Sequence, residues 1–155
     1  MKILVTGTAG FIGFHTSLSL VKSGHQVYGV DNINDYYDQD LKFNRLNELG
    51  FNKFESEIFK NETESKKFKN FRFTRIDINE EKYLNKIFQK EKFEVVCHLA
   101  AQAGVRFSIN NPKAYIDSNI NGFLNIIELC RNYNVKHLVY ASSSSVYGNN
   151  KKVPF

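Results

Sequence analysis

Short apolar runs alternate with amphipathic segments along the whole chain. The apolar runs predict strands at residues 2–6, 26–30, 71–76, 94–99 and 137–141. Apolar residues at helical spacing predict helices over 14–22, 40–49, 80–90 and 111–133. Five apolar strands separated by helices predict an α/β fold, a doubly wound parallel sheet with right-handed crossovers.

The helix at 111–133 is the longest one predicted. Asn111 suits its N-cap and Pro112 its first turn. Its spacing predicts an inward face made of Ile116, Ile120, Phe123, Ile127 and Cys130.

Residues 52–70 are polar and rich in lysine and glutamate, and they end in the basic run 66–69. Basic residues interleaved with phenylalanines could indicate a nucleic-acid surface. Four glutamates in the same segment dilute that charge: Glu55, Glu57, Glu62 and Glu64. We therefore expect a solvated insertion in a single domain over 1–155, and no nucleic-acid partner.

Composition narrows the class of protein. The chain of 155 residues carries a formal net charge of +5, which favours anionic ligands such as phosphates. No apolar run approaches the ~20 residues of a membrane span, and the first strand reaches Thr6 too soon for a signal peptide, so we expect a cytoplasmic protein. Cys97 and Cys130 lie in apolar stretches and predict buried reduced thiols rather than a metal site.

Gly7, Gly10 and Gly13 form a G-x-x-G-x-x-G turn between the first strand and the first helix. Such glycines can bring backbone close to a pyrophosphate at a helix N-terminus, or can simply make a tight turn. No Gly-Lys-Ser/Thr follows, so the turn is not a P-loop. The strand-turn-helix context favours dinucleotide binding.

Asp31 ends the second strand, about 20 residues after the glycine turn, where an acidic residue is expected to bind the adenosine ribose. The alternative for Asp31 is a role as a turn or cap residue. A carboxylate here would repel a 2′-phosphate, so the sequence predicts NAD rather than NADP.

Several motifs follow in order along the chain: residues 5–13, Asp31-Asn32, Asp77-Ile78, residues 98–101, Asn119 and residues 142–148. Together they resemble the extended short-chain dehydrogenase/reductase family of NAD-dependent nucleotide-sugar epimerases and dehydratases. Within that family the segments 31–38, 41–42 and 101–106 are similar to bacterial UDP-glucuronate 4-epimerases.

The resemblance implies a Rossmann-like fold that stops after about five strands. It also implies an NAD site in which Asp77 and Ile78 hold the adenine and Asn119 supports the strand ends. An N-cap before Glu80 is the alternative role for Asp77. The implied cofactor-binding residues are Gly7, Gly10, Phe11, Ile12, Gly13, Asp31, Asn32, Asp77, Ile78, Leu99, Ala100, Ala101 and Asn119.

The run of serines at 142–145 reads either as a polar turn or, by the resemblance, as part of the catalytic site. The resemblance puts Ser143 at the position that hydrogen-bonds the sugar C4 hydroxyl, with Ser145 as a secondary contact. Related dehydratases carry Thr-Asp-Glu at 143–145, so the serines favour epimerisation.

The implied reaction moves a hydride from sugar C4 to NAD and back to the other face, with a Tyr-x-x-x-Lys pair handling the hydroxyl proton. Only Tyr147 and Lys151 have that spacing, and Gly148-Asn149-Asn150 between them is turn sequence. We expect this pair to be a decoy, and the chain to be the inactive amino-terminal part of a UDP-glucuronate 4-epimerase that ends at Phe155 before the catalytic tyrosine.

Two other functions stay open: a self-standing NAD-binding module, and a basic nucleic-acid binder. The complete enzyme would bind a UDP-sugar and form a homodimer. Arg106, after the fourth strand, is a candidate reader of the uronate carboxylate. It could instead contact the UDP diphosphate or pair with a surface acid.

Overall fold

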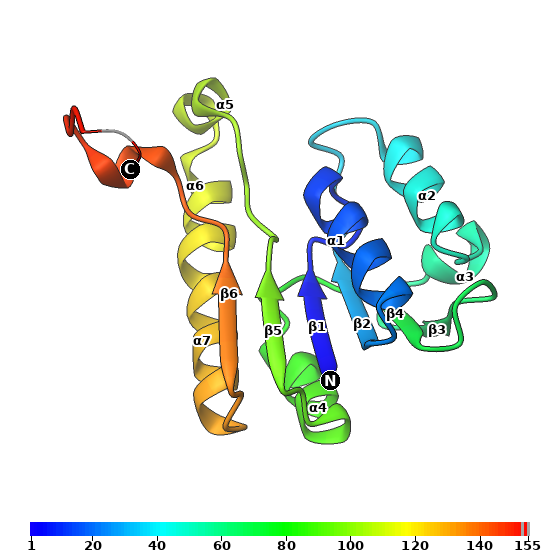
Figure 1. The fold of residues 1–155 in the computed structure, drawn as a ribbon. Coiled ribbons are helices and arrows are strands. Elements are labelled where there is room, and N and C mark those ends of the chain that lie inside the picture. The colour runs from blue at the N-terminus through cyan, green and yellow to red at the C-terminus, as the bar shows by residue number, and fades with distance from the viewer. Residues whose placement is uncertain (153, 155) are drawn as a thin grey trace.

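The computed structural model describes residues 1–152 and residue 154 as a six-stranded sheet covered by helices on both faces (Figure 1). The strands are β1 (Lys2–Thr6), β2 (Gln26–Asp31), β3 (Glu62–Glu64), β4 (Phe71–Arg75), β5 (Val95–His98) and β6 (His137–Tyr140). Their order is β3-β4-β2-β1-β5-β6, and every pairing is parallel except that of β3 with β4. The parallel α/β fold predicted from the sequence is therefore confirmed, with one additional antiparallel strand.

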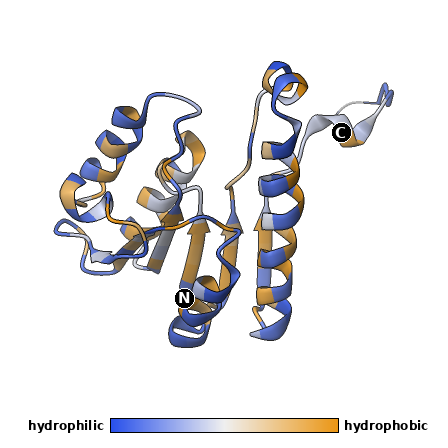
Figure 2. Ribbon diagram, turned by 180° about the vertical axis from the view of Figure 1, so that it is seen from behind, coloured by the Kyte–Doolittle hydropathy of each residue, from blue (hydrophilic) through white to orange (hydrophobic). Residues whose placement is uncertain are grey.

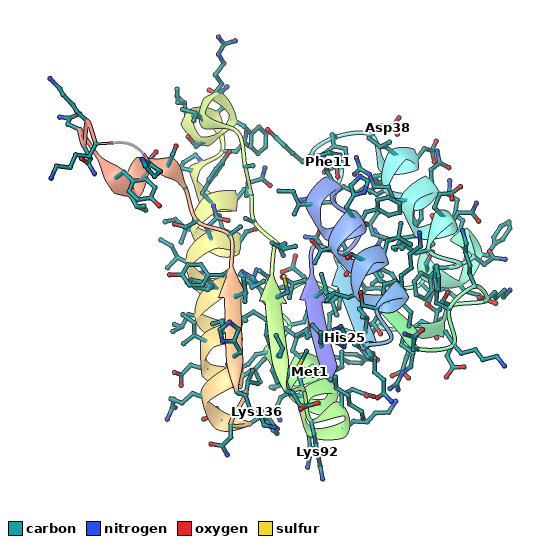
Figure 3. All side chains as sticks on the ribbon, viewed as in Figure 1. Met1, Phe11, His25, Asp38, Lys92 and Lys136 are labelled. Carbon is teal, nitrogen blue, oxygen red and sulfur yellow. The ribbon has the colours of Figure 1, made fainter. Side chains whose placement is uncertain are left out.

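Helices connect the strands in the sense expected of a doubly wound sheet. They are α1 (Phe11–Lys22), α2 (Gln39–Glu48), α3 (Lys53–Ser56), α4 (Glu81–Glu91), α5 (Val105–Asn110), α6 (Pro112–Tyr115) and α7 (Phe123–Asn132), together with a π-helical segment (Ile116–Gly122) and a 3₁₀ turn (Ser144–Tyr147). Figure 3 labels Met1, His25, Lys92 and Lys136 at one end of the sheet, and each of them precedes a strand. The carboxyl ends of the parallel strands consequently share the opposite end.

The core consists of two layers, one on each face of the sheet. Successive β1 residues alternate between them: Ile3 and Val5 pack toward α1 and α2, and Leu4 packs toward α4 and α7. Figure 2 shows the strands as the most continuously apolar part of the ribbon. Burial on both faces explains why the strands read as apolar runs in the sequence.

The segment 52–70, expected to be a solvated insertion, is exposed over most of its length, but it also forms part of the sheet. This segment contains α3 and β3, and Thr63 pairs with Phe73 of β4. Its small polar residues are buried with their hydrogen bonds satisfied: Ser56 Oγ donates to the Asn52 carbonyl, and Ser65 Oγ donates to the Leu49 carbonyl. Burial of polar side chains is tolerated when each finds a partner, so a polar sequence does not imply a solvated segment.

The inward face predicted for the long helix is correct only in part. Cys130 is buried and Phe123 is half-buried, whereas Ile116, Ile120 and Ile127 are exposed and Ile126 and Leu129 are buried instead. The chain runs through α6, the π-helical segment and α7, and a π-helix inserts an extra residue into each hydrogen-bonded turn. That insertion rotates the later residues relative to a regular helical pattern.

Strand β6 lies at the edge of the sheet, with β5 as its partner among the described strands. Cys130 is buried beside β5 and β6, and burial raises the pKa of its thiol to about 11; Cys97 is half-buried with its pKa also raised by burial. Both are free thiols, as predicted. No helix in the described part of the chain is long and apolar enough to cross a membrane.

Candidate functional site

A pocket opens at the carboxyl ends of β1, β2, β4 and β5, where ligands of open parallel sheets bind. It brings together most of the residues predicted to hold a dinucleotide, although they come from segments far apart in the sequence. The pocket is lined by Gly7, Gly10, Val30, Asp31, Asn32, Asn34, Tyr36, Tyr37, Lys42, Ile76, Ile78, Leu99, Ala100, Ala101, Gln102, Ala103 and Ser118.

The glycine turn forms the floor of this pocket. Gly7 has φ +74°, and a Cβ there would lie 2.9 Å from the nitrogen of Ala100. A Cβ on Gly13 would collide with the carbonyl of Gly7, so helix α1 packs directly on the turn. No side chain caps the N-terminus of α1. An uncapped helix N-terminus beside a glycine turn fits a bound phosphate group.

Asp31 lies at the end of β2 with its carboxylate held from two sides. Oδ2 accepts a hydrogen bond from Ala9 N at 3.0 Å, and Oδ1 accepts one from Ile33 N at 2.8 Å. Burial raises the pKa of this carboxyl; the two backbone hydrogen bonds and the charge of Lys42 oppose the rise. Each carboxylate oxygen keeps an acceptor lone pair, so Asp31 can still bind ribose hydroxyls.

Lys42 was not singled out as a site residue from the sequence, yet its side chain is buried in the pocket wall. Nζ donates to the Asn34 carbonyl at 2.8 Å and to Asn34 Oδ1 at 2.6 Å. Burial lowers the pKa of Lys42, against the opposing charge of Asp31. By its pattern alone, a lysine in α2 looks like any solvated helix residue, and the pair 41–42 stands out in the sequence only through its similarity to UDP-glucuronate 4-epimerases.

Thr6 and His98 hold the strand ends on the other side of the pocket. Thr6 Oγ1 accepts hydrogen bonds from Leu99 N at 3.1 Å and Ala100 N at 3.0 Å, so its proton is left for His98 Nδ1 at 2.8 Å. His98 stacks on Phe123, and burial lowers its pKa to about 4. A neutral imidazole with an unprotonated Nδ1 fits both observations.

Two predicted residues act through pocket residues rather than lining the pocket. Asp77 Oδ2 accepts a hydrogen bond from Asn32 Nδ2 at 2.8 Å, and its Oδ1 accepts one from Asn79 N at 2.9 Å. Asn119 pins the backbone of Gln102, because Nδ2 donates to the carbonyl at 2.9 Å and Oδ1 accepts from the amide at 2.8 Å. Asn119 thus supports the loop after β5.

Three residues of the glycine motif lie outside the pocket lining. Phe11 and Ile12 begin α1 with exposed side chains, and Gly13 is buried against the turn. Figure 3 shows Phe11 at the same end of the sheet as Asp38. Contact of Phe11 or Ile12 with a ligand in this pocket would therefore go through the backbone N–H groups.

The serines at 143 and 145 do not line the pocket. They belong to the segment that projects beyond β6 in Figure 1, where Ser143 Oγ lies 3.2 Å from Ser145 Oγ and accepts from Ser145 N. Tyr147 ends a 3₁₀ turn, and Gly148 follows with φ +57°, so Tyr147 and Lys151 do not share a helix. That the pair is a decoy stays a prediction.

Arg106 is exposed on α5, outside the pocket lining. Among residues 1–152 and 154 it makes no ion pair with an acidic side chain, so the surface-pairing alternative finds no support. In the same part of the chain, no group of three or more His, Cys, Asp or Glu side chains is placed to hold a metal ion.

Known proteins share both this sequence and this fold. The family model described as GDP-mannose 4,6 dehydratase matches residues 4–155. The chain is 51% identical to Protein CapI of Staphylococcus aureus over 155 residues, which is all of this chain and 41% of that protein. It is 49% identical to a UDP-glucuronate 4-epimerase of Thermodesulfobacterium geofontis, over 93% of this chain and 40% of that protein.

Solved structures of nucleotide-sugar 4-epimerases share the fold of this chain. A UDP-glucuronic acid 4-epimerase mutant from Bacillus cereus, in complex with NAD and UDP-4-deoxy-4-fluoro-glucuronic acid, superposes with a TM-score of 0.77 and 33% identity, over 98% of this chain and 43% of that one. UDP-glucose 4-epimerase of Thermus thermophilus in complex with NAD superposes with a TM-score of 0.69 and 30% identity, over 92% of this chain and 38% of that one.

The chain spans about two fifths of the length of these relatives. The part of them that it matches is the NAD-binding portion. Sequence motifs, sheet order and the pocket at the strand ends all agree with the family match, and the chain belongs to the NAD-dependent epimerase/dehydratase family, the extended short-chain dehydrogenases/reductases.

Proposed function

We propose that this chain is the NAD-binding portion of a UDP-glucuronate 4-epimerase. The observation that carries the proposal is the buried Asp31 carboxylate, fixed by Ala9 N and Ile33 N in a pocket floored by Gly7 and Gly10. Relatives named UDP-glucuronate 4-epimerases, at 45–49% identity, support the substrate class; one of them is 47% identical over 100% of this chain.

The pocket residues suit the parts of a dinucleotide. The turn at Gly7 and Gly10 would hold the diphosphate, and Asp31 would bind the adenosine ribose. The segment 99–101 would flank the pyrophosphate and ribose at the end of β5. Ile78 would provide an apolar contact for the adenine, and Asp77 would orient Asn32. Bound NAD supplies a reversible hydride acceptor for sugar C4.

The charge arrangement supports NAD over NADP. A 2′-phosphate would meet the Asp31 carboxylate, which the backbone N–H groups of Ala9 and Ile33 hold in place. The charge of Lys42 offsets part of this repulsion, but its ammonium already donates two hydrogen bonds to Asn34, which leaves one N–H for a phosphate.

Ser143 and Ser145 are our proposed contacts to the C4 hydroxyl of a UDP-sugar in the complete enzyme. Neither serine can take the proton of the sugar hydroxyl by itself, since a serine hydroxyl is a poor base unless a general base lies next to it. Tyr147 ends a 3₁₀ turn and Gly148 follows with φ +57°, so Tyr147 and Lys151 are not on one helix as the Tyr-x-x-x-Lys pair requires. We therefore propose that the chain alone does not epimerise.

Calorimetric titration of the chain with NAD and NADP tests cofactor binding. Hydrogen bonds from ribose hydroxyls to a carboxylate are charge-assisted, so Asp31→Ala should weaken NAD by about tenfold or more. Asp40→Ala, which removes an exposed carboxylate on α2, is the matched control and should bind NAD as the unmodified chain does. Equal affinities for NAD and NADP in the unmodified chain would refute the proposed selectivity.

Incubation of the chain with UDP-glucuronate and NAD tests the proposed inactivity. We expect no UDP-galacturonate by chromatography. Conversion that disappears in Tyr147→Phe would show that Tyr147 is the catalytic base after all.

A further inference from the structure

Two loops stand on opposite sides of the candidate cofactor pocket and meet through an aromatic contact. One loop joins β2 to α2, and the other leads from β5 into α5; Figure 1 shows them rising beyond the strand ends on the two sides of β1 and β5. Tyr36 from the first loop packs edge-on against Phe107 of α5, with ring centroids 4.8 Å apart and planes at 60°.

The second loop is shaped to receive Tyr36. Gly104 has φ +101°, and a Cβ at this position would collide with the Tyr36 hydroxyl. Tyr115 holds the same loop from below, because its hydroxyl donates to the Ala103 carbonyl at 2.7 Å and to the Gly104 carbonyl. The Tyr36 hydroxyl thus lies against Gly104, and any larger residue at position 104 would occupy the space of this hydroxyl.

The contact belongs to the pocket rather than to the core. Tyr36, Gln102 and Ala103 line the pocket, so the two loops contribute to its wall from both sides. Tyr36 is 40% exposed, and neither Tyr36 nor Phe107 belongs to either core layer. Separation of the two rings therefore exposes little buried surface, and the loops can part without unfolding of the sheet.

We propose that Tyr36 and Phe107 form a bridge across the pocket that retains the bound dinucleotide. This inference rests on the proposed NAD-dependent epimerase function. In a reaction without net redox change, the hydride taken from the sugar must return from the same cofactor molecule. If NADH left between the two hydride transfers, the 4-keto sugar could not be reduced again. Slow release of the cofactor therefore favours this reaction.

The retention role predicts a change in release rate. The test is stopped-flow dissociation of NADH from the chain, followed by its fluorescence after mixing with excess NAD; the chain contains no tryptophan to contribute a competing signal. Loss of one aromatic pair should speed release by about three- to tenfold in Tyr36→Ala and in Phe107→Ala. Tyr36→Phe keeps the ring and should stay within about twofold of the unmodified chain.

A double-mutant cycle separates the bridge from unrelated loop damage. If the two rings act through each other, the Tyr36→Ala/Phe107→Ala variant should release NADH no faster than either single variant. Ile109→Ala, an exposed apolar residue on the same helix α5, is the matched control and should release NADH at the unmodified rate. Circular dichroism of each variant checks that the fold is kept.

The outcomes are distinguishable. Binding of NADH with equal release rates in the unmodified chain, Tyr36→Ala and Phe107→Ala would overturn the retention role and leave the proposed function intact. Additive effects of the two substitutions would also overturn the bridge. Failure of the unmodified, folded chain to bind NAD or NADH would overturn the proposed function and the bridge with it.

Discussion

The hydroxyl of Thr6 and Nδ1 of His98 lie 2.8 Å apart and join the ends of two neighbouring strands, β1 and β5. Thr6 Oγ1 also accepts hydrogen bonds from the amides of Leu99 and Ala100, two residues that line the candidate cofactor pocket. One buried hydroxyl therefore fixes the backbone on which the pocket is built, because its three hydrogen bonds cross from β1 to the last residue of β5 and to the two residues after it.

Replacement of Thr6 by valine should destabilise the chain and disturb the pocket. The change keeps the shape of the side chain but leaves the Ala100 amide and His98 Nδ1 without their hydrogen-bond partner, at a cost of about 2 kcal/mol, while the Leu99 amide keeps the Thr6 carbonyl at 3.2 Å. Urea unfolding measures the loss. Thr16→Val, at a half-buried threonine of α1, is the control and should change the free energy of unfolding by less than about 0.5 kcal/mol.

His98 should make stability depend on pH. Its pKa is about 4 in the folded chain, against about 6.5 for an unperturbed histidine. Between these values the unfolded chain binds a proton that the folded chain does not, so the stability present above about pH 6.5 is lost as the pH falls toward 4, by up to about 3 kcal/mol.

Urea unfolding at several pH values from neutral to acidic, for the unmodified chain and for His98→Gln, checks this dependence. The difference between the two should shrink on acidification. His137→Gln, at an exposed histidine of β6, is the control. Parallel pH profiles for the unmodified chain and His98→Gln would contradict the assignment to His98.

Two arginine–glutamate pairs with similar geometry should differ in their effect on stability. Arg72 donates to both carboxylate oxygens of Glu91, at 2.8 and 2.7 Å, and Glu91 is 3% exposed. Arg131 donates to both oxygens of Glu128, at 3.2 and 2.6 Å, on the exposed surface of α7.

Glu91→Ala should lower the free energy of unfolding by about 1.5 kcal/mol, because Arg72 loses its bidentate partner and keeps only the Glu62 carboxylate at 3.3 Å. Glu128→Ala should leave it unchanged within error, since water screens an exposed pair. Chemical denaturation of both variants makes the comparison. Equal effects would mean that burial of Glu91 contributes nothing to the strength of its pair.

Arg106 should discriminate between substrates if it reads the uronate carboxylate. In a complete epimerase containing this chain, Arg106→Met should reduce kcat/KM for UDP-glucuronate by tens-fold, on the order expected for a lost charge-assisted bidentate contact, and leave UDP-glucose turnover unchanged. Steady-state kinetics with both sugars measures it. Equal loss for both sugars would assign Arg106 to the diphosphate, and no loss for either would leave it as a surface residue.

The parallel strands were predictable because each is buried on both faces and reads as an apolar run. Strand β1 begins and ends at the predicted residues 2 and 6, and β4 ends one residue before the predicted 76. The α/β alternation follows from the same pattern. Strand β3 escaped prediction because Glu62, Thr63 and Glu64 are polar, and their place in the sheet depends on partners in β4 and α4.

The sequence by itself determined the parts of the site that depend on local spacing. Gly7, Gly10 and Gly13 are the positions of the turn where a side chain has no room, and Asp31 must end the neighbouring strand; both requirements act within a single strand-helix-strand unit. Such short-range constraints are readable because the chain connectivity itself places these residues together.

Only the tertiary structure decided the contacts that join separate units. The bonds from Thr6 to His98, from Asn32 to Asp77 and from Asn119 to Gln102, like the packing of Tyr36 on Phe107, connect residues from different loops and strands. Lys42 is buried for the same reason, since Asn34 and Asp31 face it only after α2 has packed against the sheet. Each of these contacts requires the sheet to form first, because sheet packing is what brings segments with no shared local pattern to one edge.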